Sequence, residues 1–107
     1  MEETQASITQ WADETFGACT LLRAVDRAFE EMQELHHEAL QYPCRSPEAY
    51  GRGISNECAD ILITLYRVAS ITGFDLHAAA NAKMRVNRQR LWGVKGDGTG
   101  YHINGVA

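Results

Sequence analysis

The chain has 107 residues, of which 45% are hydrophobic and 22% charged, with a formal net charge of −4. This length suits one domain and leaves little room for a second, and the composition excludes a disordered or collagen-like chain. No apolar run approaches the roughly 18 residues that a membrane span needs, and the acidic start Met1–Thr4 lacks a hydrophobic signal segment. The three cysteines form no CxxC pair, so we expect a reduced, cytoplasmic protein.

The charge is divided unevenly along the chain. Residues 1–60 hold twelve acidic side chains against four arginines, a balance of −8, whereas residues 61–107 have a balance of +4. Such asymmetry is found in proteins with a tail that binds nucleic acid. It also suits a site of which one half holds cations and the other holds anions.

Helical periodicity dominates the first part of the chain. Apolar residues over 8–16 predict a short amphipathic helix, capped by Ser7 and ended near Gly17. From Thr20 to Gln41 the apolar residues recur at spacings of three and four, which predicts one long helix. Thr20 is its expected N-cap, and Pro43 stops it.

The second part of the chain continues the pattern. Residues 42–53 carry two prolines and two glycines and predict a loop. A third helix is expected over 55–72, between a Ser55 cap and Gly73, and a fourth over 76–91, capped by Asp75. We find no convincing strand pattern, and the glycine-rich residues 93–107 predict an irregular tail. The prediction is therefore an all-α, four-helix-bundle-type fold: one domain over 1–107, with its core at about 8–92.

Two pairs of carboxylates have the spacing of a metal site. Glu31 and Glu34 are three residues apart in the long helix, as are Glu57 and Asp60 in the third, so each pair shares a helix face. If the two helices pack antiparallel, the pairs can face each other, and oxygen ligands alone favour Mg²⁺ or Mn²⁺ over zinc. A single ExxE is also common on solvated helix faces, so neither pair alone establishes a site.

Taken in order, these residues resemble a known family. EExxE at Glu30, Glu31 and Glu34, followed by ExxD at Glu57 and Asp60, is similar to the signature of the MazG-like all-α nucleoside triphosphate pyrophosphohydrolases. The downstream pattern Lys83-x-x-x-Asn87, followed by Arg90 and Trp92, resembles the phosphate-binding helix of that family. The resemblance covers roughly residues 8–102.

The resemblance implies a role for each matched residue. Glu31, Glu34, Glu57 and Asp60 would be ligands of Mg²⁺, with Mn²⁺ as a possible substitute. Glu30 and Glu34 would be the catalytic carboxylates, with Glu30 as an accessory group that either supports the metal ligands or positions water. The substrate-binding residues would be Lys83, Asn87, Arg90, Trp92 and, in the first helix, Trp11.

The same resemblance implies an activity and an assembly. The family hydrolyses a nucleoside triphosphate to the monophosphate and pyrophosphate, commonly to remove unwanted nucleotides. Its members form dimers or tetramers that complete the pocket across subunits, so we expect a homo-oligomer, a tetramer built from two dimers. No membrane or nucleic-acid partner is expected.

Several alternatives stay open. Phosphoribosyl-ATP pyrophosphohydrolases share this helical architecture. The basic stretch over 83–90 suits a non-catalytic or nucleic-acid-binding module, although the whole chain has a pI near 5.5. Glu34 and His37 form the ExxH pair used by di-iron bundles, without a second copy. Trp11 and Phe16 suit core packing better than stacking on a base.

Overall fold

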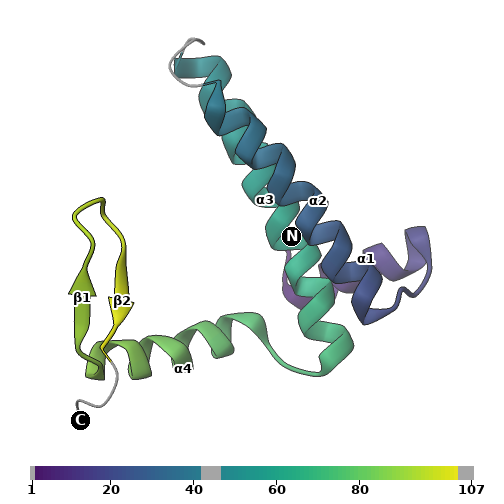
Figure 1. The fold of residues 1–107 in the computed structure, drawn as a ribbon. Helices are drawn as coiled ribbons and strands as arrows, with labels where there is room; N and C mark the ends of the chain where they lie inside the picture. The colour runs from purple at the N-terminus through teal and green to yellow at the C-terminus, as the bar shows by residue number, and fades with distance from the viewer. Residues whose placement is uncertain (1, 42–46, 104–107) are drawn as a thin grey trace. The chain divides into compact units, whose positions relative to one another are not determined.

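The computed structural model describes residues 2–41 and 47–103 and is mostly helical, as predicted (Figure 1). It divides into two compact units, Met1–Leu76 and His77–Ala107. The prediction of one domain over 1–107 stays a prediction. The first unit contains helices α1 (Gln5–Phe16), α2 (Leu21–Leu40) and α3 (Pro47–Thr72). The second is built from α4 (Leu76–Gln89) and strands β1 (Trp92–Val94) and β2 (Gly100–His102).

Helices α2 and α3 run antiparallel and side by side, as the carboxylate hypothesis required (Figure 1). The face of α2 that is least exposed carries Ala24, Ala28, Glu31 and Leu35, at spacings of three and four. Opposite it, α3 buries Ile61 and Ala69. The buried apolar side chains of the described residues are small apart from Ile61, so the core is narrow and one of its few buried positions is the charged Glu31.

Helix α1 begins three residues earlier than Ser7 predicted. Thr4 is the N-cap, and its side chain accepts a hydrogen bond from the Ser7 backbone while the Ser7 hydroxyl accepts one from the Thr4 backbone. Ser7 therefore takes part in a capping box from inside the helix and is not the cap itself. The predicted end at Gly17 is confirmed, where φ is +86°.

The cap of α2 is confirmed, and the start of α3 is corrected. The Thr20 side chain accepts a hydrogen bond from the Arg23 backbone at 3.1 Å. Helix α3 begins at Pro47, so the loop prediction is wrong for residues 47–53, and residues 42–46 lie outside the described chain. Proline is well suited to the first position of a helix, where its missing N–H costs nothing. The predicted end before Gly73 is confirmed.

The irregular tail predicted for residues 93–107 is wrong where the described residues form strands, and residues 104–107 lie outside the described chain. Strands β1 and β2 pair antiparallel, with Trp92 opposite His102 and Gly93 opposite Tyr101. Helix α4 starts at Leu76 as predicted but ends at Gln89, two residues before the expected Leu91. Within the described residues, no helix has the length and apolar character needed to cross a membrane.

Candidate functional site

Three of the four predicted metal ligands come together between α2 and α3. One carboxylate oxygen from each of Glu31, Glu57 and Asp60 lies within 4.8 Å of the other two. Glu57 and Asp60 share a face of α3 because they are one turn apart, and Glu31 lies on the buried face of α2. In the part of the chain that the structure describes, this acidic cluster is the one group with the arrangement of a metal site, and it contains no histidine or cysteine.

The acidic cluster runs from the protein interior to the solvent. Glu31 is only 3% exposed, Glu57 is half-buried and Asp60 is exposed. Oε2 of Glu31 and Oε2 of Glu57 are both buried and have no hydrogen-bond partner. Burying a carboxylate oxygen without a partner costs free energy, and a hard cation with oxygen ligands removes that cost. The donor set therefore fits a divalent ion such as Mg²⁺ or Mn²⁺.

The titration of the acidic cluster reflects the same burial. Burial, followed by the neighbouring Glu34 carboxyl, raises the pKa of Glu31 to about 7, although the Arg27 guanidinium opposes the shift. Burial also raises the pKa of Glu57, again with a contribution from Glu34. Both shifts show that negative charge in this cluster lacks full compensation by the protein alone.

Glu34, the fourth predicted ligand, lies beside the cluster. Its side chain is exposed, and it lines a shallow depression together with Glu57 and Arg27. It raises the pKa of both Glu31 and Glu57, although the tight group comprises the other three carboxylates. Its roles as ligand and catalytic carboxylate stay predictions.

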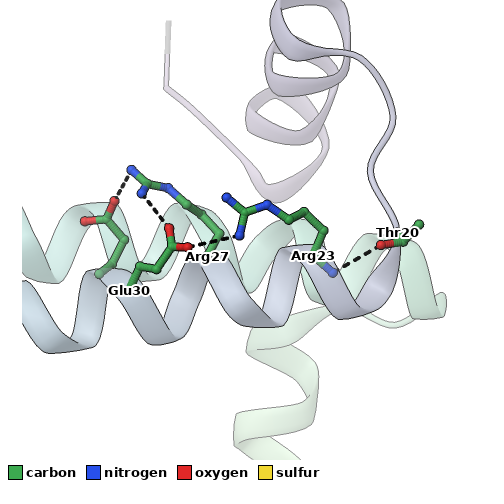
Figure 2. A network of polar contacts seen from close by, with 5 residues as sticks. Thr20, Arg23, Arg27 and Glu30 are labelled. Carbon is green, nitrogen blue, oxygen red and sulfur yellow. Dashed lines mark hydrogen bonds and ion pairs between the residues drawn. The ribbon is translucent and has the colours of Figure 1, made fainter.

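Glu30 forms ion pairs with two arginines of α2 and is not one of the three grouped carboxylates. Nη1 of Arg23 lies 3.1 Å from Oε1 of Glu30, and Nη1 of Arg27 lies 3.0 Å from Oε2. Figure 2 shows both arginines reaching Glu30 along α2. These guanidinium groups, Arg27 first, lower the pKa of Glu30. Arg27 also contacts Glu31 at 2.5 Å, so it links the two glutamates. The sequence analysis missed Arg27, although its position four residues before Glu31 is a known ion-pair spacing on helices. The accessory role of Glu30 stays a prediction.

A cavity of about 560 Å³ in the first unit adjoins the acidic cluster. Glu31 and Asp60 line one part of it, and Trp11 and Phe16 of α1 line another. The two aromatic rings meet edge to face, with centroids 5.5 Å apart. Trp11 is 54% exposed and Phe16 70%, so the core-packing interpretation of this pair is wrong within the chain. The cavity also contains Arg67, which sequence analysis could not single out because its partners are about fifty residues away.

The remaining predicted substrate-binding residues belong to the second unit. Asn87 and Trp92 contact each other, since the indole Nε1 donates to the Asn87 carbonyl at 2.8 Å. The Asn87 side-chain oxygen is buried without a hydrogen-bond partner. Lys83 is exposed on α4, and Arg90 follows the end of that helix. Substrate binding by Lys83, Asn87, Arg90 and Trp92 stays a prediction.

The di-iron interpretation loses its support. Nε2 of His37 lies 2.6 Å from the side-chain amide of Gln41, one turn along α2. His37 is not part of the acidic cluster, whose ligands in the described chain are carboxylates alone.

Comparison with known proteins gives two informative matches, although no family model matches the sequence. A dATP/dGTP diphosphohydrolase of Salmonella phage PMBT28 is 31% identical over 101 residues, which are 94% of this chain and 31% of that protein. The chain thus spans less than a third of the length of that curated relative.

The second match is a solved structure, the cyanophage S-2L MazG-like pyrophosphohydrolase bound to dGDP and three catalytic Mn²⁺ ions per active site. It aligns with a TM-score of 0.70 and 27% identity, over 95% of this chain and 91% of that one. The chain therefore shares the fold of this MazG-like pyrophosphohydrolase and is similar to it in sequence over nearly its whole length.

Proposed function

We propose that this chain is a Mg²⁺-dependent pyrophosphohydrolase of deoxynucleoside triphosphates, releasing the monophosphate and pyrophosphate. The observation that carries the proposal is the pair of buried, unpartnered carboxylate oxygens of Glu31 and Glu57, at the positions where the family signature expects metal ligands. The Salmonella phage relative is named for dATP and dGTP, and the cyanophage enzyme holds dGDP with Mn²⁺. These matches support a purine deoxynucleotide as the substrate.

The proposed roles of the site residues follow their charge: the carboxylates bind metal and the basic residues bind phosphate. Glu31, Glu34, Glu57 and Asp60 hold the divalent ions, which when bound neutralise phosphate oxygens and acidify water. Glu30 positions the attacking water. Lys83 and Asn87 hold the phosphates, and Lys83, assisted by Arg90, offsets negative charge on the departing pyrophosphate. Trp92 closes over the nucleotide. Trp11 contacts the base from the cavity that adjoins the acidic cluster.

The proposal extends to the cellular setting. We propose a homo-oligomer, a tetramer built from two dimers, that acts in the cytoplasm on the nucleotide pool and removes unwanted nucleotides. The exposed apolar residues of α2 support the oligomer, and the cysteine content supports the compartment.

A substrate panel with direct detection of pyrophosphate tests the activity. The four common deoxynucleoside triphosphates and phosphoribosyl-ATP are each incubated with Mg²⁺ or Mn²⁺. We expect pyrophosphate, and no orthophosphate, from dATP or dGTP, and loss of all release with a chelator. Release from phosphoribosyl-ATP alone would assign the chain to histidine synthesis, and no release from any substrate would refute the proposal.

Two isosteric variants test the metal ligands. Glu31→Gln and Asp60→Asn should each reduce kcat/KM at least about a hundredfold, because even outer partners of metal ligands cost about 10–100-fold. Both should also weaken Mn²⁺ binding, measured by electron paramagnetic resonance of the free ion. Glu48→Gln, on an exposed position of α3, is the matched control and should change neither value. Full activity in Glu31→Gln would contradict the assignment.

A further inference from the structure

We propose that Arg67 is a positioning residue that holds one wall of the substrate cavity in place. This wall, which we term the α1 wall, consists of Trp11, Phe16 and residues 17–19, all of which line the cavity of about 560 Å³. The inference rests on the proposed function, because the consequence of moving the α1 wall is measured through nucleotide binding and hydrolysis.

Arg67 connects α3 to the end of α1. Its Nη2 donates to Oδ1 of Asp13 at 2.8 Å and to the backbone carbonyl of Gly17 at 2.9 Å. Asp13 lies in the last turn of α1, and Gly17 is its C-cap. Carbonyls beyond the last turn of a helix have no partner within the helix, so the guanidinium supplies one. A single charged group thus fixes both the last turn of α1 and the chain that leaves it.

The geometry of Arg67 favours an indirect role. Nη2 has two hydrogens, and the two acceptors on the α1 side account for both. Nε is buried without a partner, and the whole side chain is only 14% exposed. The rigid, planar guanidinium suits a fixed connection between two elements better than the flexible ammonium of lysine does. Arg67 therefore acts through Asp13 and Gly17 on the α1 wall, and is not assigned contact with the substrate.

A second attachment of α1 to α3 provides the comparison. The Thr9 and Ser70 hydroxyls are hydrogen-bonded at 2.9 Å, and the Gln5 side chain donates to the Phe74 carbonyl at 2.8 Å. Neither Thr9 nor Gln5 lines the cavity, whereas Arg67 and Gly17 do. Loss of the Thr9 contact should weaken the docking of α1 without changing the α1 wall. Loss of the Arg67 contacts should change the position of the α1 wall, while the first turns of α1 stay packed against α3.

Steady-state kinetics with dGTP and Mg²⁺ separate the two attachments. We expect Arg67→Met to raise KM about tenfold, the value of a hydrogen bond to a charged group, and to change kcat less than about twofold. Thr9→Val should leave both constants unchanged. Arg67→Lys should recover part of the affinity. Asp13→Ala should raise KM in the same direction, and the double variant with Arg67→Met should be little worse than Arg67→Met alone.

Fluorescence gives a measurement that does not depend on turnover. The chain has two tryptophans, so a Trp92→Phe background leaves Trp11 in the α1 wall as the single reporter. In that background we expect Arg67→Met, but not Thr9→Val, to shift the emission maximum of the nucleotide-free protein. The same variant should also weaken the change in emission that dGTP produces.

The outcomes distinguish this inference from the proposed function. An active wild-type enzyme with unchanged KM and unchanged Trp11 emission in Arg67→Met and Asp13→Ala would overturn the positioning role. A fall in kcat at constant KM would also overturn it. Absence of pyrophosphate release from the wild type would refute the proposed function, and the emission shift would still test Arg67. If Arg67→Met does not fold, Asp13→Ala, whose side chain is 51% exposed, carries the test.

Discussion

Glu31 is a carboxylate on the packing face of a helix, where an apolar residue is expected. It is 3% exposed, and its one ion-pair partner among the described residues is Arg27, at 2.5 Å. Arg27 also forms an ion pair with Glu30, so a single guanidinium is shared between two carboxylates. Removing a charge from water is costly unless it is well compensated. We therefore expect the stability of the first unit to depend on whether a proton or a cation neutralises Glu31.

The stability of the metal-free protein should consequently fall as pH rises. The pKa of Glu31 is about 7 in the folded chain, against an ordinary value of 4.5, so folding favours the neutral carboxyl. Its contribution to the free energy of unfolding is complete below about pH 4.5 and is lost as pH rises through about 7. The pKa of Glu57 is shifted in the same direction and adds to the effect. Thermal unfolding of chelator-treated protein should show a lower Tm at pH 8 than at pH 5.

Divalent ions and a matched variant check this prediction. Mg²⁺ or Mn²⁺ binds the ionised carboxylates, so either ion should restore the Tm at pH 8 and should release protons when it binds below about pH 7. Glu31→Gln, which cannot ionise, should show a flatter dependence of Tm on pH and a smaller response to the ions. A Tm of the metal-free wild type that increases from pH 5 to pH 8 would contradict the prediction.

At the scale of the elements, helical periodicity found the four helices but not all of their ends. Thr20, Gly17 and Gly73 mark boundaries because a cap residue or a positive φ is a local property. The start of α3 differs from the prediction because the two prolines and two glycines over 42–53 predict a loop, whereas Pro47 stands at the first position of a helix. The wide apolar pattern of α2 also combines two faces: Ala28 and Leu35 pack inward, while Leu22 and Phe29 are exposed.

The sequence predicts those parts of the candidate site that depend on local spacing, and not those that depend on contacts between distant residues. The one-turn spacing of Glu57 and Asp60 is local, and their meeting with Glu31 required only that α2 and α3 pack antiparallel. Arg67 depends on Asp13 and Gly17, which are distant in sequence, and no local spacing reveals such contacts. The hairpin was missed because its strands have three residues each, too few for an alternating pattern.

The hairpin depends on a glycine beneath an aromatic ring. Gly93 pairs with Tyr101, and a Cβ at position 93 would overlap the tyrosine ring. Gly93→Val should therefore force the strands apart, at a cost of about 1–3 kcal/mol, which a two-stranded hairpin cannot absorb. We expect faster amide hydrogen exchange at Lys95 and Ile103, whose N–H groups bond to Thr99 and Leu91 across the hairpin.

An exposed position on the same strand provides the control for Gly93. Val94 is 80% exposed, so Val94→Thr keeps the β-branched shape and should leave the exchange rates unchanged. Equal exchange rates in Gly93→Val and the wild type would show that the Tyr101 ring moves aside without loss of pairing.

On the scale of the whole molecule, the charge asymmetry follows the two compact units. Met1–Leu76 has thirteen acidic residues against five arginines, a balance of −8, and His77–Ala107 has five basic residues against Asp97, a balance of +4. The acidic cluster belongs to the first unit, and Lys83 and Arg90 belong to the second. The charges of the two units thus suit the proposed roles of these residues, metal binding for the acidic cluster and phosphate binding for Lys83 and Arg90.

One apolar face of α2 stays exposed among residues 2–41 and 47–103. Leu22, Val25, Phe29 and Met32 follow one another at spacings of three and four, and their exposed fractions are 70%, 45%, 63% and 49%. A continuous apolar stripe of this kind is typical of a protein interface. A second copy of the chain would cover it, because most oligomers of small proteins are symmetric and use the same surface on both copies.

We therefore expect the wild type to exceed the monomer mass of 11.9 kDa in light scattering at micromolar concentration. Phe29→Glu places a charge in the centre of the stripe, and burying it there would cost several kcal/mol, so this variant should be monomeric. Its Mn²⁺ affinity should persist, since Glu31, Glu57 and Asp60 come from one chain. Glu14→Lys, an equally drastic change at an exposed position of α1, should leave the mass unchanged. A wild type of monomeric mass would show that the α2 stripe is not an interface between copies, and would leave the oligomer proposal without support.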